Sequence, residues 1–305
     1  GGMLSHSNTI QTANRLMPVL AEYPFSPQSI RTADGHTLSF LDEGSGPPVV
    51  MLHGNPSWSY LYRNVVTALR AEYCCIVPDH LGCGLSDKPQ DWPYRLENHI
   101  SNFNRLLDHL SVERCVLMVH DWGGAIGMGW AGRCPERVAG LVILNTAAFR
   151  SKQLALRIAV CRWPLLGSIL VRGLNGFAKP AAFMAVRKKM QPQIKAGFLF
   201  PYNNWANRIA VHRFVQDIPL RPAHPSWNTL VEIEHALPRL RDKPMLICWG
   251  GRDFCFNDVF YAEWRHRFPQ AASWYFPDAG HYLLEDALPE VLHLLPDFLQ
   301  SCQFC

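Results

Sequence analysis

The chain has 305 residues, of which 48% are hydrophobic and 18% are charged. This composition supports a large buried core and excludes a disordered chain. The formal net charge of +4 gives no reason to expect nucleic acid as a partner. No apolar run reaches the roughly 18–20 residues that a transmembrane helix needs, and no secretory signal is recognisable. Gly1 and Gly2 before Met3 resemble a tag remnant.

The expected elements alternate between strands and helices along the chain. Apolar runs predict strands at 37–42, 48–52, 74–77, 115–119, 138–144, 245–250 and 273–276. Helical spacing, or a position directly after a strand, predicts helices at 58–70, 97–110, 122–134, 257–267 and 288–299. This alternation predicts an α/β fold with a mostly parallel central sheet and helices on both faces.

The rhythm breaks between residues 147 and 225, where helix-like stretches are interrupted by prolines and glycines. We therefore predict a helical cap at 147–225, inserted into a core domain formed by 1–146 and 226–305. The ten cysteines are scattered, which is typical of a cytoplasmic protein with reduced thiols. The C-terminal pair Cys302 and Cys305 is interpreted as part of a frayed tail and not as a zinc or redox site.

The strongest local motif is VLMVHDWGG, Val116 to Gly124, in which a buried strand runs directly into Asp121 and a following helix. A potential nucleophile on a sharp strand-to-helix turn is typical of the nucleophile elbow of the α/β-hydrolase fold. Gly123 supplies the small residue that such a turn needs. The helix N-terminus stabilises a carboxylate in its ionised form, so Asp121 is the predicted nucleophile.

Two further motifs supply the partners of a nucleophile. In HGNP, Asn55 follows the sequence HG, and its backbone N–H is expected beside that of Trp122 in an oxyanion hole. Both side chains also carry N–H groups, which suit an anionic leaving group. In GHYLLED, His281 follows the last strand and is the predicted base.

The acid that orients His281 is assigned by elimination. Asp253 follows the strand at 245–250, whereas the other usual position, after the strand ending near Leu144, holds Asn145. Asp258 remains a weaker alternative. The histidines show no metal-binding spacing, and no dinucleotide or phosphate-binding loop is present, so neither a metal nor a cofactor is expected.

The motifs HGNPSWSYLYR, DHLGCGLSDKP, HDWGGAIG, WGGRDFCF and DAGHYLLED together resemble the haloalkane dehalogenase branch of the α/β-hydrolases. The resemblance implies that Asp121 forms an alkyl ester, that His281 activates water and that Asn55 and Trp122 hold a halide. Epoxide hydrolases share HDWGG but use cap tyrosines. Tyr202 is a candidate for such a cap contact, although Asn55 argues against that class.

The segments 200–220 and 144–149 most resemble the β-lactone decarboxylases of bacterial long-chain olefin biosynthesis. The resemblance implies conversion of a cis-β-lactone with two long alkyl chains into a cis-alkene and carbon dioxide. Asp121 would attack either the ring carbon that bears oxygen or the lactone carbonyl, and the sequence does not choose between them. Haloalkane dehalogenase activity is the alternative.

The predicted cap is strongly basic. Residues 150–221 contain thirteen lysines and arginines and one acid, Asp217, so this segment carries +12 against +4 for the whole chain. Three interpretations follow: docking on acidic proteins of a multi-enzyme assembly, contact with an anionic membrane surface, or a solvated face above a hydrophobic pocket. The apolar residues of the cap are expected to line the site of a long-chain substrate.

Overall fold

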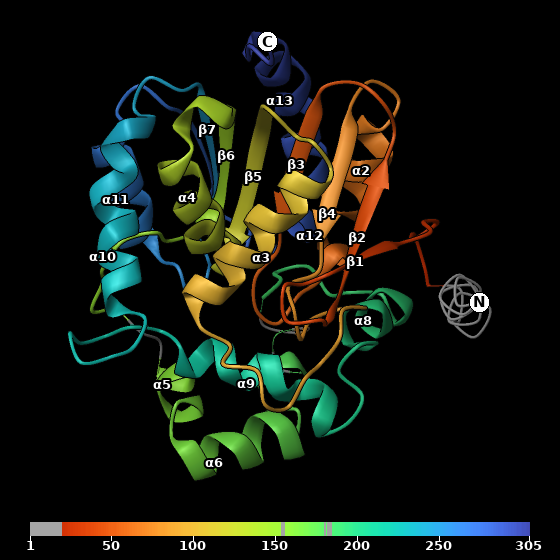
Figure 1. Cartoon of the computed structure of the whole chain (residues 1–305), viewed down its shortest axis with the longest axis vertical. Helices are drawn as coiled ribbons and strands as arrows, with labels where there is room; N and C mark the ends of the chain where they lie inside the picture. Colours follow the sequence, from red (N-terminus) through yellow and green to blue (C-terminus); the bar gives the residue numbers. More distant parts are fainter. Residues whose placement is uncertain (1–19, 154–155, 180, 182–184) are drawn as a thin grey trace.

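The computed structural model describes residues 20–153, 156–179, 181 and 185–305, so Gly1, Gly2 and the other residues of the N-terminal segment lie outside the described part. An eight-stranded sheet runs in the order β1-β2-β4-β3-β5-β6-β7-β8 (Figure 1). Its strands are β1 (Gln28–Arg31), β2 (Thr37–Glu43), β3 (Pro48–Leu52), β4 (Cys74–Pro78), β5 (Cys115–Asp121), β6 (Val138–Thr146), β7 (Met245–Gly250) and β8 (Ala272–Phe276).

The sheet is mostly parallel, as predicted. From β4 to β8 every neighbouring pair is parallel, whereas β2 pairs antiparallel with both β1 and β4. The short edge strand β1 was not predicted. Only one of its four residues is buried, so it lacks the apolar run that marks the central strands.

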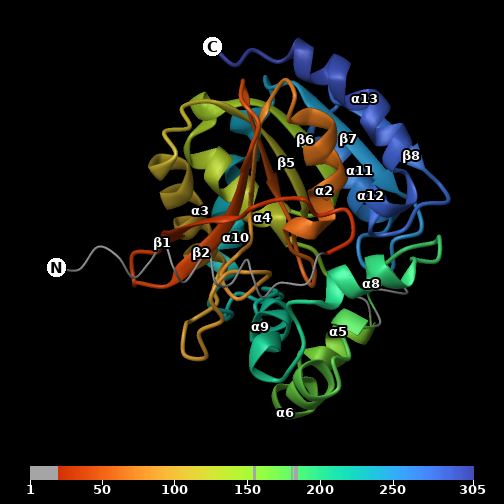
Figure 2. The ribbon, with the colours of Figure 1, turned by 90° about the vertical axis from the view of Figure 1, so that its right-hand side faces the viewer.

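Helices cover both faces of the sheet (Figure 2). The helices α2 (Arg63–Leu69), α12 (Leu283–Asp286) and α13 (Leu288–Ser301) pack with one hydrophobic cluster. The second cluster includes α3 (Leu96–His109), α4 (Trp122–Arg133), α10 (Trp227–Ala236) and α11 (Asp258–Arg267).

The central strands divide their side chains between these two clusters. In β3, Val49 and Met51 belong to the first cluster, whereas Val50 and Leu52 belong to the second. All four are fully buried. The alternation follows from the pleat of a strand, and burial on both faces explains the continuous apolar runs in the sequence.

We use the word cap for residues 147–225, the range predicted from the sequence. Its described residues form helices and loops: α5 (Leu156–Cys161), α6 (Pro164–Ser168), the π-helical turn η3 (Ile169–Gly173), α8 (Pro192–Leu199), the short turn η4 (Ala206–Arg208) and α9 (Ile209–Gln216). These elements lie beyond the ends of the central strands (Figure 1). Within the described part of the chain, no helix is long and apolar enough to cross a membrane.

The C-terminal tail corrects one prediction. The tail that contains Cys302 and Cys305 was predicted to be frayed. The side chain of Cys302 is instead buried and belongs to the first hydrophobic cluster. Arg114 also donates from Nε to the carbonyl of Gln303 at 2.6 Å, and the ring of Phe304 lies 6.2 Å from that of Tyr73. The prediction failed because packing against α13 and the sheet is not visible in the composition of a short tail. Both thiols are free.

Candidate active site

Asp121 ends β5 and precedes the first residue of α4, in a backbone conformation that is unusual for aspartate. Its φ is 53° and its ψ is −128°, a strained combination of the kind found at nucleophile elbows. A Cβ at Gly123 would overlap the carbonyl oxygen of Leu52, and one at Gly54 would overlap the Asp121 side chain. Both glycines therefore allow the turn and the loop to approach closely, as the sequence predicted for Gly123.

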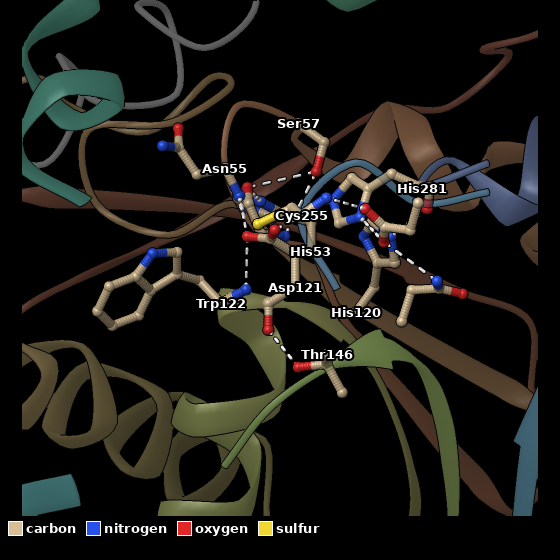
Figure 3. Close-up of polar contacts among 12 residues, drawn as sticks. His53, Asn55, Ser57, His120, Asp121, Trp122, Thr146, Cys255 and His281 are labelled. Carbon is tan, nitrogen blue, oxygen red and sulfur yellow. Dashed lines mark hydrogen bonds and ion pairs between the residues drawn. The ribbon is translucent and has the colours of Figure 1, made fainter. Parts of the chain in front are cut away.

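The two backbone N–H groups predicted to form an oxyanion hole hold the carboxylate of Asp121 itself. Asn55 N donates to Asp121 Oδ2 at 2.8 Å, and Trp122 N donates to the same oxygen at 2.6 Å (Figure 3). The other oxygen, Oδ1, lies 3.0 Å from His281 Nε2. The carboxylate is therefore fixed by one oxygen while the second faces the histidine.

His281 connects Asp121 to Asp253. His281 Nδ1 lies 2.6 Å from Asp253 Oδ2. Asp258, the alternative acid, instead accepts a hydrogen bond from Tyr275 at 2.9 Å in an exposed position. The structure thus brings Asp121, His281 and Asp253 into one chain of contacts and keeps Asp258 out of it.

Two groups that sequence reasoning missed fix the carboxylate of Asp253. Asn145 donates from Nδ2 to Asp253 Oδ2 at 3.1 Å, and Cys255 donates from its backbone N to Oδ1 at 2.6 Å. Asn145 was considered only as a residue that fails as an acid. Its place at the end of β6, beside the end of β7, was the available indication that it could contact Asp253.

Neighbouring charges shift the pKa of Asp121 and that of His281. Burial alone would raise the pKa of Asp121, but the hydrogen bond and positive charge of His281 outweigh it and leave that pKa below its usual value. Burial disfavours the imidazolium of His281, yet Asp253 and Asp121 raise its pKa to about 10. At neutral pH the site therefore holds an imidazolium between two carboxylates.

His120 and Thr146, which sequence reasoning did not single out, support the backbone around these groups. His120 Nε2 lies 2.7 Å from the carbonyl oxygen of His281, and the two rings are 4.4 Å apart. Thr146 donates from Oγ1 to the carbonyl oxygen of Asp121. Their contacts connect β5, β6 and the His281 loop at the carboxylate.

The side chains of Asn55 and Trp122 lie on the same side of Asp121 (Figure 3) and both line a cavity. They are not equivalent donors. Asn55 donates from Nδ2 to the carbonyl of Val211 in α9 at 3.0 Å, whereas no described residue accepts from the indole N–H of Trp122. The Trp122 ring lies 5.2 Å from that of Phe214. One amide hydrogen of Asn55 is thus directed to the cap.

Tyr202 does not reach the carboxylate. Its hydroxyl donates to the carbonyl of Ser57 at 2.8 Å, its side chain is buried, and it is not among the residues that line the cavity. The contact fixes the cap to the HGNP loop. In this position the hydroxyl of Tyr202 does not line the cavity, where an acid of an epoxide hydrolase would have to lie.

The cavity above Asp121 has a volume of about 1000 Å³, including its open mouth. Its wall is largely apolar and comes from both core and cap, with Leu96, Phe149, Phe177, Val215 and Leu230 among its residues. Such a wall favours a hydrophobic ligand, and the polar groups that it surrounds at Asp121 are few.

The sheet, the elbow and the contacts among Asp121, His281 and Asp253 define an α/β-hydrolase. The family model described as alpha/beta hydrolase fold matches residues 47–288. The chain belongs to this family. It is 49% identical over 277 residues to a cis-3-alkyl-4-alkyloxetan-2-one decarboxylase of Shewanella oneidensis, covering 88% of this chain and 87% of that protein. A protein of the same name from Xanthomonas campestris is 44% identical over 91% of this chain and 97% of its own length.

Haloalkane dehalogenases are more distant relatives. Haloalkane dehalogenase 2 of Mycobacterium tuberculosis is 31% identical over 87% of this chain and 92% of its own length. The crystal structure of the haloalkane dehalogenase DatA from Agrobacterium tumefaciens superposes with a TM-score of 0.80 at 25% identity, over 90% of this chain and 96% of that one. The resemblance noted in the sequence to both groups, and the predicted fold class, are thereby confirmed.

Proposed function

We propose that this chain is a β-lactone decarboxylase that converts a cis-3,4-dialkyl-oxetan-2-one into a cis-alkene and carbon dioxide. The similarity to two proteins named for this substrate class carries the assignment of the reaction. The carboxylate of Asp121, held at the base of an apolar cavity, supports it chemically. A long-chain lactone has little polar surface outside its ring, which suits that cavity.

In the proposed first step, Asp121 Oδ1 attacks the ring carbon that bears oxygen. The new bond is an alkyl ester, the ring C–O bond breaks, and its electron pair leaves with the lactone carboxylate. The backbone N–H groups of Asn55 and Trp122 hold Oδ2, which becomes the carbonyl oxygen of the ester. The indole N–H of Trp122 and the second amide hydrogen of Asn55 would hold the released carboxylate, as they would hold a halide.

In the proposed second step, the C–C bond to the carboxylate breaks. Its electrons form the alkene, the ester C–O bond breaks, and the electron pair returns to Asp121. The imidazolium of His281, 3.0 Å from Oδ1, stabilises the returning charge. Inversion followed by anti elimination preserves the cis arrangement, and the cycle consumes no water or proton.

The contacts of Asp121 favour this route over attack on the lactone carbonyl. Carbonyl attack creates an oxyanion on the substrate, which needs N–H donors of its own. The two backbone donors at this position already hold Asp121 Oδ2. Attack at the ring carbon creates no such oxyanion, so it makes no demand on them.

Purified protein would be incubated with a synthetic cis-β-lactone carrying two long alkyl chains, beside the Asp121→Ala variant, and alkene would be measured by gas chromatography. Alkene from the wild type alone supports the proposal. Turnover in heavy-oxygen water tests the route, because obligatory entry of label into Asp121 would contradict a water-free cycle.

Haloalkane dehalogenase activity is the second candidate, because the same residues would suit a halide-releasing reaction. Asp121 would form the alkyl ester, and His281 would activate water against it. Chloride or bromide release from haloalkanes, without alkene from the lactone, would replace the decarboxylase assignment by this one.

We also propose a cytoplasmic location, which the ten free thiols support.

The basic cap suits an anionic partner. Acidic enzymes of a multi-enzyme assembly are one candidate, and retention of such enzymes on the immobilised chain at low salt, with release at high salt, is the test. An anionic membrane surface is the other candidate.

A further inference from the structure

Large apolar side chains are exposed at the end of the cap that lies farthest from the sheet. Trp163, directly before α6, is 58% exposed, and Leu166 in α6 is 40% exposed. Ile169 in η3 is 47% exposed, Leu174, directly after η3, is 65% exposed, and Trp205 from the neighbouring loop is 47% exposed. We call these five residues the cap tip. Figures 1 and 2 both place α6 at the extremity of the molecule, with the rest of the cap between it and the sheet.

The outward face of this segment differs from that of an ordinary solvated helix, on which polar residues are expected. Between Trp163 and Leu174 the only polar side chains are Ser168 and Arg172. Ser168 Oγ lies 3.3 Å from His212 Nδ1 on the inner side. The guanidinium of Arg172 lies 4.8 Å from the centre of the Trp205 ring and donates to Gln90 at 2.7 Å. The other exposed side chains that the structure describes in this stretch are apolar.

Arginines surround the cap tip. Arg208 donates to the carbonyl of Arg172 at 2.8 Å, and Arg162 donates to the carbonyl of Ile218 at 2.6 Å. Burial and the charge of Arg221 lower the pKa of Arg162. Such mutual proximity of cations indicates a concentrated positive potential. The surrounding set is Arg162, Arg172, Arg208, Arg213 and Arg221.

The one acid of the cap offsets only part of this potential. Asp217, its one acid, is buried and directed toward the core, where Arg95 lies 3.2 Å from Oδ1. Leu96 N donates to Oδ2 at 2.7 Å and Ser226 Oγ donates to Oδ1 at 2.6 Å. Asp217 therefore forms no ion pair with any of these five arginines, although its charge partly offsets that of Arg221 on Arg162. Arg221 is exposed and the other four are half-buried.

We propose that the cap tip docks on the surface of an anionic lipid bilayer. Its indole and aliphatic side chains would enter the boundary between headgroups and acyl chains, while the surrounding arginines would contact lipid phosphates. An apolar surface bordered by cations is the composition that interfacial membrane contacts require. A protruding tip also suits a fluid surface, which needs no complementary shape. The tip alone would be in the bilayer, so the contact is peripheral.

The docked orientation would bring the substrate cavity close to the lipid. Phe177 and Ala181 line the cavity and follow Leu174 by three and seven residues. If the proposed reaction is correct, its long-chain product is a hydrocarbon for which the bilayer is the favourable solvent. The docking itself does not depend on that reaction.

The test is flotation of the full chain with vesicles of phosphatidylglycerol and phosphatidylethanolamine, compared with neutral phosphatidylcholine vesicles, at low and high salt. The double variant Trp163→Asp with Leu174→Asp would be compared with Val259→Asp with Trp274→Asp. Val259 and Trp274 are 55% and 50% exposed and lie on α11 and β8, away from α6 (Figure 2). Thermal melting would verify that each variant folds.

The proposal expects binding to anionic vesicles that weakens at high salt, and a loss of about tenfold or more in the cap-tip variant alone. No binding, equal binding to neutral vesicles, or equal losses in both double variants would overturn it. So would a wild-type dimer that the cap-tip variant converts to a monomer, since the tip would then serve a second copy of the chain. No lactone is used, so this outcome and that of the activity assay are independent.

Discussion

Replacing His281 by glutamine separates two roles that this residue could have. In the proposed water-free route, His281 is needed only as a cation that keeps Asp121 ionised and stabilises its charge when the ester breaks. In a hydrolytic route it must remove a proton from water. The variant His281→Gln keeps a polar side chain at Asp121 but removes both the positive charge and the base.

The size of the effect follows from the contacts of the imidazole. Asp253 and Asp121 raise the pKa of His281 to about 10 from an ordinary value of 6.5, which corresponds to roughly 5 kcal/mol of stabilisation of its charged form. If about half of this belongs to Asp121, reciprocity means that loss of the cation weakens ionisation of Asp121 by about 2 kcal/mol. This raises the pKa of Asp121 by about 1.5 units, which is roughly a thirtyfold loss of ionised nucleophile at a pH below that pKa.

The sign of the pH dependence is then fixed. In the wild type the pKa of Asp121 lies below its usual value, so alkene formation should be flat from about pH 6 to pH 9, with Asp121 ionised and His281 charged. In His281→Gln, buried Asp121 gains a proton more readily, so the loss of alkene formation at acidic pH should begin about 1.5 pH units higher than in the wild type, with full recovery toward pH 9. Gas chromatography of alkene from about pH 4 to pH 9 is the assay, with a no-enzyme control for lactone hydrolysis.

One result would refute this reasoning. If the wild type takes up heavy oxygen from water into Asp121 during turnover, while His281→Gln forms no alkene at pH 9 and accumulates an ester on Asp121 without this label, the step after ester formation needs a base. Alkene without recovery at high pH would also contradict the electrostatic role, because restored ionisation of Asp121 is the only change that the higher pH is expected to make.

Three further changes test the surrounding geometry. Trp122→Phe removes the indole N–H but keeps a ring, so kcat should fall roughly 10- to 100-fold in the alkene assay. Asn145→Ala removes a donor to Asp253 Oδ2; kcat should fall about tenfold with little change in KM. Gly123→Ala forces a Cβ into the Leu52 carbonyl, so the melting temperature should drop by several degrees or more.

For each of these three variants, one result would contradict the role that we expect for the residue. Unchanged kcat in Trp122→Phe would remove the indole from the proposed carboxylate site. A change in KM alone for Asn145→Ala would mean that this residue affects substrate binding and not the orientation of Asp253. A Gly123→Ala protein with wild-type melting and activity would contradict the close approach of the elbow to β3.

The sequence was sufficient where local pattern and chain order determine position. The buried strands produce continuous apolar runs because both faces of the sheet are covered, and Asp121, His281 and Asp253 follow strand ends, which meet at one edge of a parallel sheet. These residues could therefore be grouped without coordinates. His281 lies 2.6 Å from Asp253 and 3.0 Å from Asp121, as expected for a nucleophile, an acid and a histidine in this chain order.

The sequence was insufficient where a contact depends on the placement of the cap. The hydrogen bond from Asn55 to the carbonyl of Val211 joins two segments that share no periodic pattern, and a backbone acceptor carries no sequence information. Tyr202 likewise had the right chemistry for an acid, but its hydroxyl is engaged with Ser57. The direction of a side chain in an irregular helical insertion is decided by tertiary packing.

A dehalogenase and the proposed decarboxylase differ in what happens to the leaving group. A halide leaves the substrate carbon as the ester forms, so water is the reagent that must then regenerate Asp121. A lactone carboxylate remains bonded to the carbon next to the ester carbon, so loss of carbon dioxide itself expels Asp121 and regenerates it. The same carboxylate, imidazolium and N–H donors therefore serve both reactions, and the substrate selects between them. Exclusion of water from the apolar cavity then matters, because water reaching the ester would divert the intermediate to a β-hydroxy acid.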